Sequence, residues 1–350
     1  MAGLIRYAEG DIVNDTQRVA TSTWFNNTNK LTSALMHTSS LQAVFTNPTS
    51  LAAHYLNIYY DNTNSGSEFS VSYGHVAGSG SLEYTTGTGG DGFSPSRVIY
   101  NQYRQLVYGD ENSTFSFNGY VPDHIWVINV NRSRYKHNLK PGTLYLKLTA
   151  NSKTRSYTDD SITTSGSATI TNAGRQFNIV SGSTPGVMLG STLNQSAGAA
   201  HGCYGLFYPD SGFIILNPDA LDAEHGGSTA ATLDPDVTQN YGSSVNNNAK
   251  WFYNAIKLGN HFVLDSEEKI SSQFYFTRAR NSEFNYTTNP SFVDTNGSVN
   301  ITSMIDNPTT YITTVGMYND SGDLVAVAKI SQPVTKDFTK EALIRVKLDY

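Results

Sequence analysis

The chain has 350 residues, of which 15% are charged, and a formal net charge of −6. A chain of this length can bury a large core and can hold more than one domain. Its mild acidity, with no run of Lys or Arg, excludes the basic surface typical of nucleic-acid-binding proteins.

The composition favours β-structure over helix. Asn, Ser, Thr and Gly separate the apolar positions, and the 22 Tyr and 16 Phe suit pleated surfaces. We therefore predict a mainly β protein, a β-rich α+β fold of antiparallel hairpins and sheets with two or three short helices and long polar loops.

Cysteine content and hydropathy exclude further classes. Cys203 is alone, so no disulfide framework and no cysteine-based metal site is expected. No apolar run approaches the roughly 18 residues of a membrane span, so no membrane span is expected. The first ten residues lack the basic start and apolar core of a signal peptide, which favours synthesis and folding in the cytoplasm.

Residues 1–150 form the first predicted part, which is β-rich and contains one clear helix near residues 95–108. Ser94 can cap that helix, and Gly109 suits its end. Ile99, Tyr103 and Leu106 are expected to share its buried face.

Further elements are predicted around this helix. Leu31–Ser50 has a loose helical spacing, whereas Leu51–Tyr60 and Glu68–Tyr73 are typical of strands. His124–Val130 and Thr143–Leu148 are predicted to pair as a hairpin.

Residues 151–262 form a middle part whose composition is consistent with an insertion. Its first 50 residues are rich in Ser, Thr, Gly and Asn, which predicts short surface strands and loops. A hairpin is predicted over residues 204–217, with a surface turn at Pro209–Gly212, and a short helix over Ala249–Leu258.

Residues 263–350 form a C-terminal β part, expected to pack with the N-terminal part. Ser272–Arg280 is a predicted strand, and Tyr311–Ile330 is a predicted hairpin with a surface turn at Asn319–Asp323. Ile344, Val346, Leu348 and Tyr350 alternate with charged residues, which predicts a final strand with one buried face.

The search for chemistry finds no catalytic motif. The chain lacks a Gly-x-Ser-x-Gly elbow, a Walker loop and a dinucleotide fingerprint. We therefore expect no catalytic residues, no cofactor and no essential metal. Two carboxylates can meet from any distance in sequence, so a carbohydrate-cleaving enzyme stays open as an alternative.

Three segments contain residue types that can carry chemistry, and each has a simpler interpretation. His225 follows Asp219, Asp222 and Glu224, but a polar loop after a short helical turn is favoured over a carboxylate–imidazole site. His201 and Cys203 are expected to be buried rather than catalytic. The segment 294–300 begins like a calcium loop but has its glycine at the wrong position, so an ordinary turn is expected.

Several segments together resemble a family of virion structural proteins of contractile-tailed bacteriophages, best represented among marine cyanophages and usually assigned to the tail or baseplate. The similarity is strongest at the C-terminus. The matching segments are 94–106, 124–136 with Pro141–Gly142, 204–210, 267–290, 313–320 and 340–350.

The resemblance implies a non-enzymatic structural component of a virion, present in several copies and in contact with other phage structural proteins. The alternative is a receptor- or carbohydrate-binding tail module, which would also use exposed aromatic residues and polar loops. A tyrosine-containing polar segment is the predicted subunit interface. Its residues are Asn281, Glu283, Phe284, Asn285 and Tyr286.

Overall fold

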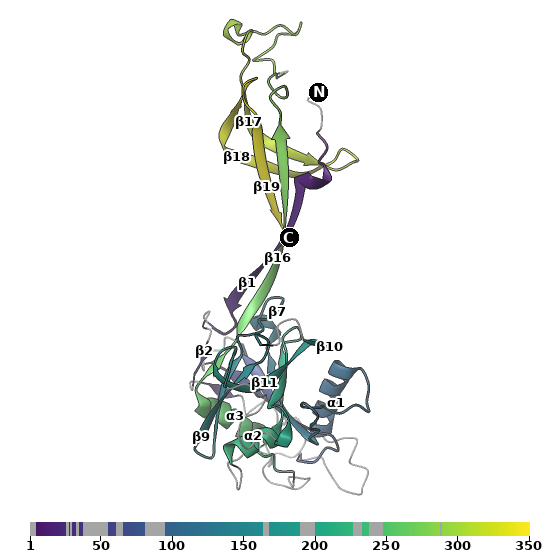
Figure 1. Ribbon diagram of the computed structural model, residues 1–350, viewed down its shortest axis with the longest axis vertical. Coiled ribbons are helices and arrows are strands. Elements are labelled where there is room, and N and C mark those ends of the chain that lie inside the picture. The colour runs from purple at the N-terminus through teal and green to yellow at the C-terminus, as the bar shows by residue number, and fades with distance from the viewer. Residues whose placement is uncertain are drawn as a thin grey trace. The chain divides into compact units, whose positions relative to one another are not determined.

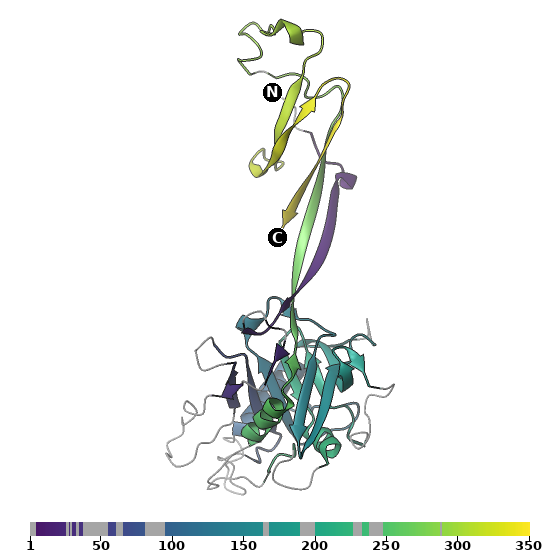
Figure 2. The same ribbon diagram turned by 90° about the vertical axis from the view of Figure 1, so that its left-hand side faces the viewer.

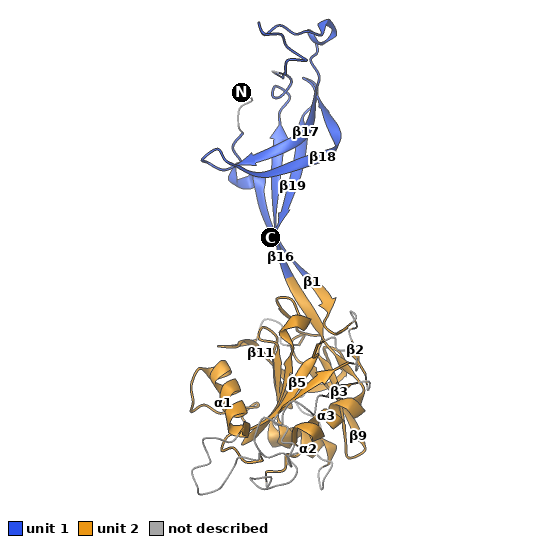
Figure 3. Cartoon of the chain, turned by 180° about the vertical axis from the view of Figure 1, so that it is seen from behind, with its two compact units in different colours: residues 1–18, 269–350 blue, residues 19–268 orange. Residues whose placement is uncertain are grey.

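The structure is a computed structural model of the whole chain. It describes residues 5–25, 28, 30–32, 35–37, 55–60, 66–80, 95–163, 168–189, 200–226, 233–237, 248–287 and 289–350. The chain divides into two compact units, which Figure 3 colours separately. Unit 1 comprises Met1–Arg18 and Lys269–Tyr350, and unit 2 comprises Val19–Glu268.

This division differs from the three parts expected from the sequence. Strands from residues 19–150 and from residues 151–262 join one sheet in unit 2, so the middle part is no separate insertion there. The three parts were inferred from changes in composition along the chain. Strand pairing instead joins segments that are far apart in the sequence, so the compact units do not follow those changes.

Unit 2 is built on a 13-stranded sheet whose strand pairs are antiparallel, which confirms the predicted mainly β fold (Figure 1). β10 (Thr169–Thr171) and β12 (Val187–Met188) lie beside β11. In order across the sheet, the other strands are β2 (Lys30–Leu31), β15 (Phe262–Val263), β8 (Tyr145–Ala150), β9 (Lys153–Asp159), β11 (Gly174–Thr184), β13 (Gly205–Tyr208), β14 (Phe213–Leu216), β6 (His124–Val130), β5 (Phe69–His75), β4 (Tyr55–Tyr59) and β3 (Met36–His37).

The central strands of this sheet are buried on both faces. In β6, Trp126 and Ile128 enter one apolar cluster, whereas Ile125 and Val127 enter another. Because both faces are covered, β6 is a continuous apolar run rather than an alternating one. Figure 2 shows the same sheet from the side.

Helices cover the two faces. α3 (Asn248–Gly259) packs on the first cluster, where Phe252 stacks on Trp126 with ring centroids 5.1 Å apart. α1 (Pro95–Tyr108) contributes to the second cluster, where Tyr103 contacts Phe213. The third helix, α2 (Pro218–His225), follows β14 directly.

The predicted helices at 95–108 and 249–258 are confirmed, and the predicted face of α1 is right in part, because Tyr103 is buried and Ile99 packs against the second cluster. The buried apolar residues of α1 are Tyr100, Tyr103 and Val107, whereas Leu106 is 44% exposed. The predicted residues and the observed buried residues both have the spacing of one helix face. The observed residues are the ones that complete the cluster beneath the helix. Gly109 ends the helix with φ +75°, as expected, and Ser94 lies outside the described residues.

The predicted hairpin of His124–Val130 with Thr143–Leu148 is wrong. β6 pairs with β5 and β14, and β8 pairs with β9 and β15. Both segments are strands, but each is apolar enough to suit several neighbours, so periodicity does not select the partner.

Two further expectations about unit 2 need correction. β11, from the segment expected to form surface loops, is an 11-residue strand with a buried centre. The described residues between 30 and 37 form β2 and β3 rather than a helix, and residues 38–54 lie outside the described residues.

The 204–217 hairpin is confirmed as β13 and β14, and Gly212 has φ +78°. Its turn is only partly at the surface, because Asp210 is exposed and Ser211 is half-buried, whereas Pro209 and Gly212 are buried. The backbone N–H of Leu139 donates to the carbonyl of Pro209, and that of Val130 donates to the carbonyl of Gly212. Neighbouring segments therefore cover the first and last residues of the turn and leave Asp210 exposed.

Unit 1 contains one sheet and one hairpin (Figure 1). The sheet order is β1 (Ile12–Ser22), β16 (Asp265–Ala279) and β19 (Ala342–Asp349). The first residues of β16 belong to unit 2, and β7 (Asn138–Leu139) pairs with them there. β17 (Thr310–Tyr318) and β18 (Leu324–Lys336) form the predicted hairpin, and Gly322 in its turn has φ +87°. Short 3-10 turns lie at Glu9–Asp11 and Thr302–Met304.

The predicted C-terminal strand is confirmed as β19, which pairs with β16 from Ala342 to Asp349. Ile344, Val346 and Leu348 share a face in the apolar cluster of unit 1. Tyr350 was expected on the same buried face, but its side chain is 72% exposed. The strand is therefore less deeply buried than its alternation indicates.

Candidate assembly surface

The predicted interface segment lies in unit 1, between β16 and β17, and its five residues have different environments. Phe284 and Tyr286 are exposed, and the ring of Tyr286 meets Phe292 edge-on at 6.0 Å. Glu283 accepts a hydrogen bond from the backbone N–H of Arg280 at 2.9 Å. Asn281 is also exposed, so Asn281 and the two aromatic side chains are placed to meet a partner.

Asn285 has an internal role instead. It is buried, and its Oδ1 atom accepts a hydrogen bond from the Lys336 ammonium at 2.7 Å. Its amide donates to the carbonyl of Asn281 at 2.6 Å, and Lys336 donates to the same carbonyl at 3.1 Å. These bonds join the segment to the end of β18.

A second exposed apolar surface of unit 1 was not predicted. It lies on the β17–β18 hairpin and consists of Tyr318, Leu324 and Val327, whose side chains are 49%, 53% and 52% exposed. Tyr318 and Leu324 lie over Gly316, and Val327 is the register partner of Gly316. We call these three residues the hairpin patch.

The inward face of the same hairpin is small. Val315 and Met317 point inward and, with Val346, are the three buried residues of this apolar cluster. Ala326 and Ala328 pack against them from β18.

In β18, Val327 thus faces outward, whereas Ala326 and Ala328 face the cluster. Leu324 has the same parity as these alanines, and it lies beside Tyr318 because the register shifts there. Alternation in the sequence therefore predicts the outward position of Val327 but not that of Leu324.

Strand edges add to the uncovered surface. Within the described residues, β17 and β18 pair only with each other, and β19 pairs only with β16. An unpaired edge presents a row of backbone donors and acceptors that another strand can bind. A hairpin alone is marginal in stability, and three or more strands with an apolar face are normally needed.

One ion pair and one side-chain hydrogen bond link β16 to the two ends of the β19 segment. Arg278 donates to Glu341 at 2.6 Å, and this hydrogen bond lowers the pKa of Glu341. Ser272 donates to Asp349 at 2.6 Å, which lowers the pKa of the Asp349 carboxyl. Because the Arg278 and Glu341 side chains are exposed, their ion pair contributes little to stability.

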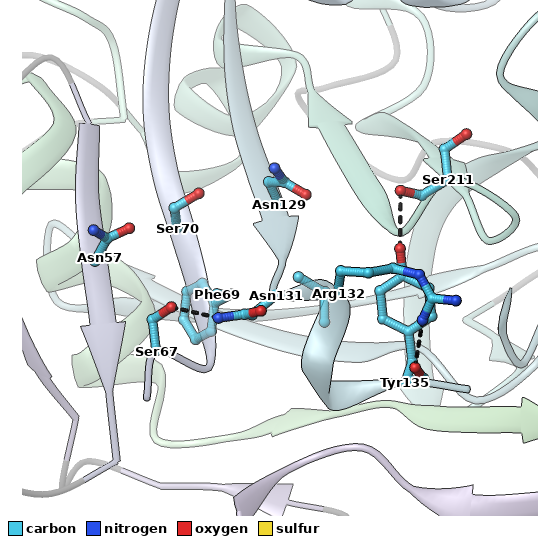
Figure 4. Close-up of a pocket in the computed structure, with 10 residues that line it drawn as sticks. Asn57, Ser67, Phe69, Ser70, Asn129, Asn131, Arg132, Tyr135 and Ser211 are labelled. Atoms are coloured by element: carbon cyan, nitrogen blue, oxygen red, sulfur yellow. Dashed lines mark hydrogen bonds between the residues drawn. The ribbon is translucent and has the colours of Figure 1, made fainter. Parts of the chain in front are cut away.

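Unit 2 contains a polar pocket of about 430 Å³, shown in Figure 4. Its polar groups bond to one another: Asn131 donates to Ser67 at 2.7 Å, and Arg132 donates to the carbonyl of Tyr135 at 2.6 Å. Its two rings, Phe69 and Tyr135, are buried. Neither ring is therefore exposed for stacking against a ligand.

The structure separates the residues around His225. His225 is buried, with Nε2 3.3 Å from the carbonyl of Leu148, and burial lowers its pKa to about 4. Glu224 pairs with Arg155 at 3.0 Å. Asp219 contacts neither of them, because its carboxylate faces His124 and Tyr120. No carboxylate–imidazole site forms at His225.

The other two segments largely match their simpler interpretations. Cys203 is buried, and burial raises its pKa to about 12, so its thiol is not activated. His201, which was also expected to be buried, is only half-buried. The Asp294 carboxylate accepts backbone hydrogen bonds from Asn296 and Ser298, and Gly297 has φ +84°, as in an ordinary turn.

Comparisons with known proteins do not assign the chain to a family. No described helix is long and apolar enough to cross a membrane. No family model, no curated protein and no solved structure matches the chain.

Proposed function

We propose that this chain is a non-enzymatic structural component of a bacteriophage virion, in the tail or baseplate, that acts through protein–protein interfaces in several copies. The observation that carries the proposal is the imbalance in unit 1 between a very small buried cluster and the exposed hairpin patch. The phage assignment itself rests on the resemblance of the segments given above.

A unit that has a small buried cluster and an exposed apolar patch is stabilised when it associates with another chain. The three buried residues Val315, Met317 and Val346 supply little apolar burial at roughly 1.5–3 kcal/mol for each fully buried side chain. Covering the hairpin patch with a second chain would add comparable burial. Proteins that assemble obligately often have no stable monomer, and unit 1 fits that description.

The partners are other copies of this chain or other phage structural proteins, and the resulting location is the virion. Phe284 and Tyr286 can extend the contact beyond the patch, since both are exposed in the same unit. Aromatic residues are enriched in the cores of such interfaces.

Sedimentation velocity of the purified full chain tests the association. We expect the wild-type chain to form species of several copies and Val327→Asp to dissociate them. The matched control is Leu258→Asp, which alters an exposed apolar residue of α3 in unit 2 and should leave the distribution unchanged. A wild-type monomer with a protease-resistant unit 1 would contradict the proposed self-association.

A further inference from the structure

Three oxygen- and nitrogen-bearing side chains from distant parts of the sequence converge in unit 2. His124 begins β6, Asp219 lies in the first turn of α2, and Asp234 lies in the described segment 233–237. One ligand atom from each lies within 4.8 Å of the other two. We propose that His124, Asp219 and Asp234 bind a divalent transition-metal ion of the Zn²⁺ or Mn²⁺ class.

The distances suit coordination. His124 Nε2 lies 3.0 Å from Asp219 Oδ1. Two ligands that each lie about 2.0–2.2 Å from one ion stand roughly 3–3.5 Å apart, so these two atoms need almost no movement. Asp234 is exposed, and its side chain can rotate to complete the set.

The ligands are held by their surroundings. Tyr120 donates to Asp219 Oδ2 at 2.6 Å, which fixes the carboxylate and leaves Oδ1 toward His124. Such outer hydrogen bonds orient metal ligands in proteins. Asn217 caps α2, and its amide donates to the carbonyl of Cys203 at 3.2 Å, so the helix turn that carries Asp219 is itself anchored.

The segment that carries Asp234 is anchored on both sides. Trp126 Nε1 donates to the carbonyl of Leu233 at 3.1 Å. The Asn248 side chain accepts from the backbone N–H of Asp236 at 2.9 Å and donates to its carbonyl at 3.2 Å. Asp234 therefore lies between two fixed points beside His124 and Asp219.

The local electrostatics favour a cation. One carboxylate oxygen of Asp219 and one of Asp234 lie within 4.8 Å of each other. A divalent ion would neutralise the repulsion between these carboxylates.

The donor types restrict the ion. An imidazole suits Zn²⁺ and other transition metals, whereas a purely carboxylate and carbonyl set would suit Ca²⁺ or Mg²⁺.

A pocket of about 350 Å³ opens at His124 and Asp219, with Tyr120 and Asp123 in its wall. It leaves room for water as a further ligand. The ion would join β6, α2 and the 233–237 segment.

Isothermal titration calorimetry of the full chain with Zn²⁺, and separately with Mn²⁺, tests this site. We expect one ion per chain, and we expect Asp234→Asn and His124→Gln each to weaken binding by at least about 10-fold. Asp123→Asn is the matched control, because it removes an exposed carboxylate from the same pocket without removing a ligand. It should change the affinity less than the ligand variants.

Thermal unfolding separates binding from misfolding. Added Zn²⁺ should raise the melting temperature of the wild-type chain but not that of Asp234→Asn, and the two should melt alike in chelator because Asp234 is exposed. No stoichiometric binding, an equal loss in Asp123→Asn and Asp234→Asn, or binding of Ca²⁺ as tight as Zn²⁺ and indifferent to His124→Gln would overturn the proposal.

Discussion

The Nζ atom of Lys336 lies 2.7 Å from Oδ1 of Asn285, and both side chains are buried. The ammonium also donates to the carbonyls of Asn281 and Asp337, at 3.1 and 3.0 Å. Three acceptors satisfy its three donors. Lys336 therefore ties the predicted interface segment to the end of β18 and holds Phe284 and Tyr286 next to the rest of unit 1.

Replacing this lysine should destabilise the chain. Lys336→Met leaves Asn285 Oδ1 buried without its donor, and we expect a loss of about 1–3 kcal/mol in the free energy of unfolding. Urea unfolding measures it. Lys329→Met, at an exposed position of the same strand, is the control and should change stability by no more than about 0.5 kcal/mol. Equal effects of the two substitutions would refute the role given to Lys336.

The two hairpin glycines should differ in their sensitivity. Both have positive φ, but a Cβ at Gly322 meets no neighbour, whereas one at Gly212 would overlap the ring of Tyr135. Gly322→Ala should cost about 1–2 kcal/mol from backbone strain alone, and Gly212→Ala should cost more. Urea unfolding of both variants measures the difference, and the reverse order would contradict the packing of Tyr135 on the turn.

Acid should weaken unit 2 through His225. Burial, with smaller effects of Arg155 and Lys153, lowers the pKa of His225 to about 4 in the folded chain, against about 6.5 in the unfolded chain. Between these values the unfolded chain binds the extra proton. The free energy of unfolding therefore falls as the pH falls through this window, by up to about 3 kcal/mol.

Urea unfolding at pH 7 and at pH 4.5, for the wild type and His225→Gln, isolates this contribution. The glutamine can still donate to the carbonyl of Leu148, which His225 Nε2 approaches at 3.3 Å, and it does not titrate. We expect a smaller loss of stability in the variant. An identical loss in both proteins would show that His225 protonates without cost.

Removal of residues 344–350 should unfold unit 1. The deletion removes most of the β16–β19 pairing and Val346, one of the three buried residues of the cluster. Limited proteolysis should then degrade unit 1 while unit 2 stays protected, because its clusters lie elsewhere. Tyr350→Ala, at an exposed side chain, is the control and should behave as wild type. A truncated chain with a resistant unit 1 would contradict the assignment of its core.

The parts of the fold that the sequence predicted are those set by neighbouring residues. Gly212 and Gly322 mark hairpin turns because a positive φ is a local requirement. The partner of β6 was not predictable in this way, because its apolar residues on both faces suit several strands. Strand pairing is decided by the whole sheet.

The candidate sites also divide into those set by neighbouring residues and those that depend on the whole fold. Phe284 and Tyr286 were found because an aromatic in a polar loop is visible in the sequence, whereas the hairpin patch required knowing which face of β18 points outward. His124, Asp219 and Asp234 are separated along the chain by the strands and the helix that bring them together. The spacing of these three residues in the sequence does not predict that they form a cluster.

Cross-linking mass spectrometry of purified phage particles tests the central claim most directly. Lys329 lies next to the hairpin patch on β18 and is exposed, so an amine-reactive cross-linker should join it to other copies of this chain or to other tail and baseplate proteins. Lys250 of α3, also exposed, should give fewer links between chains. Absence of the chain from the particles, or links from Lys329 only within its own chain, would contradict the proposed assembly role.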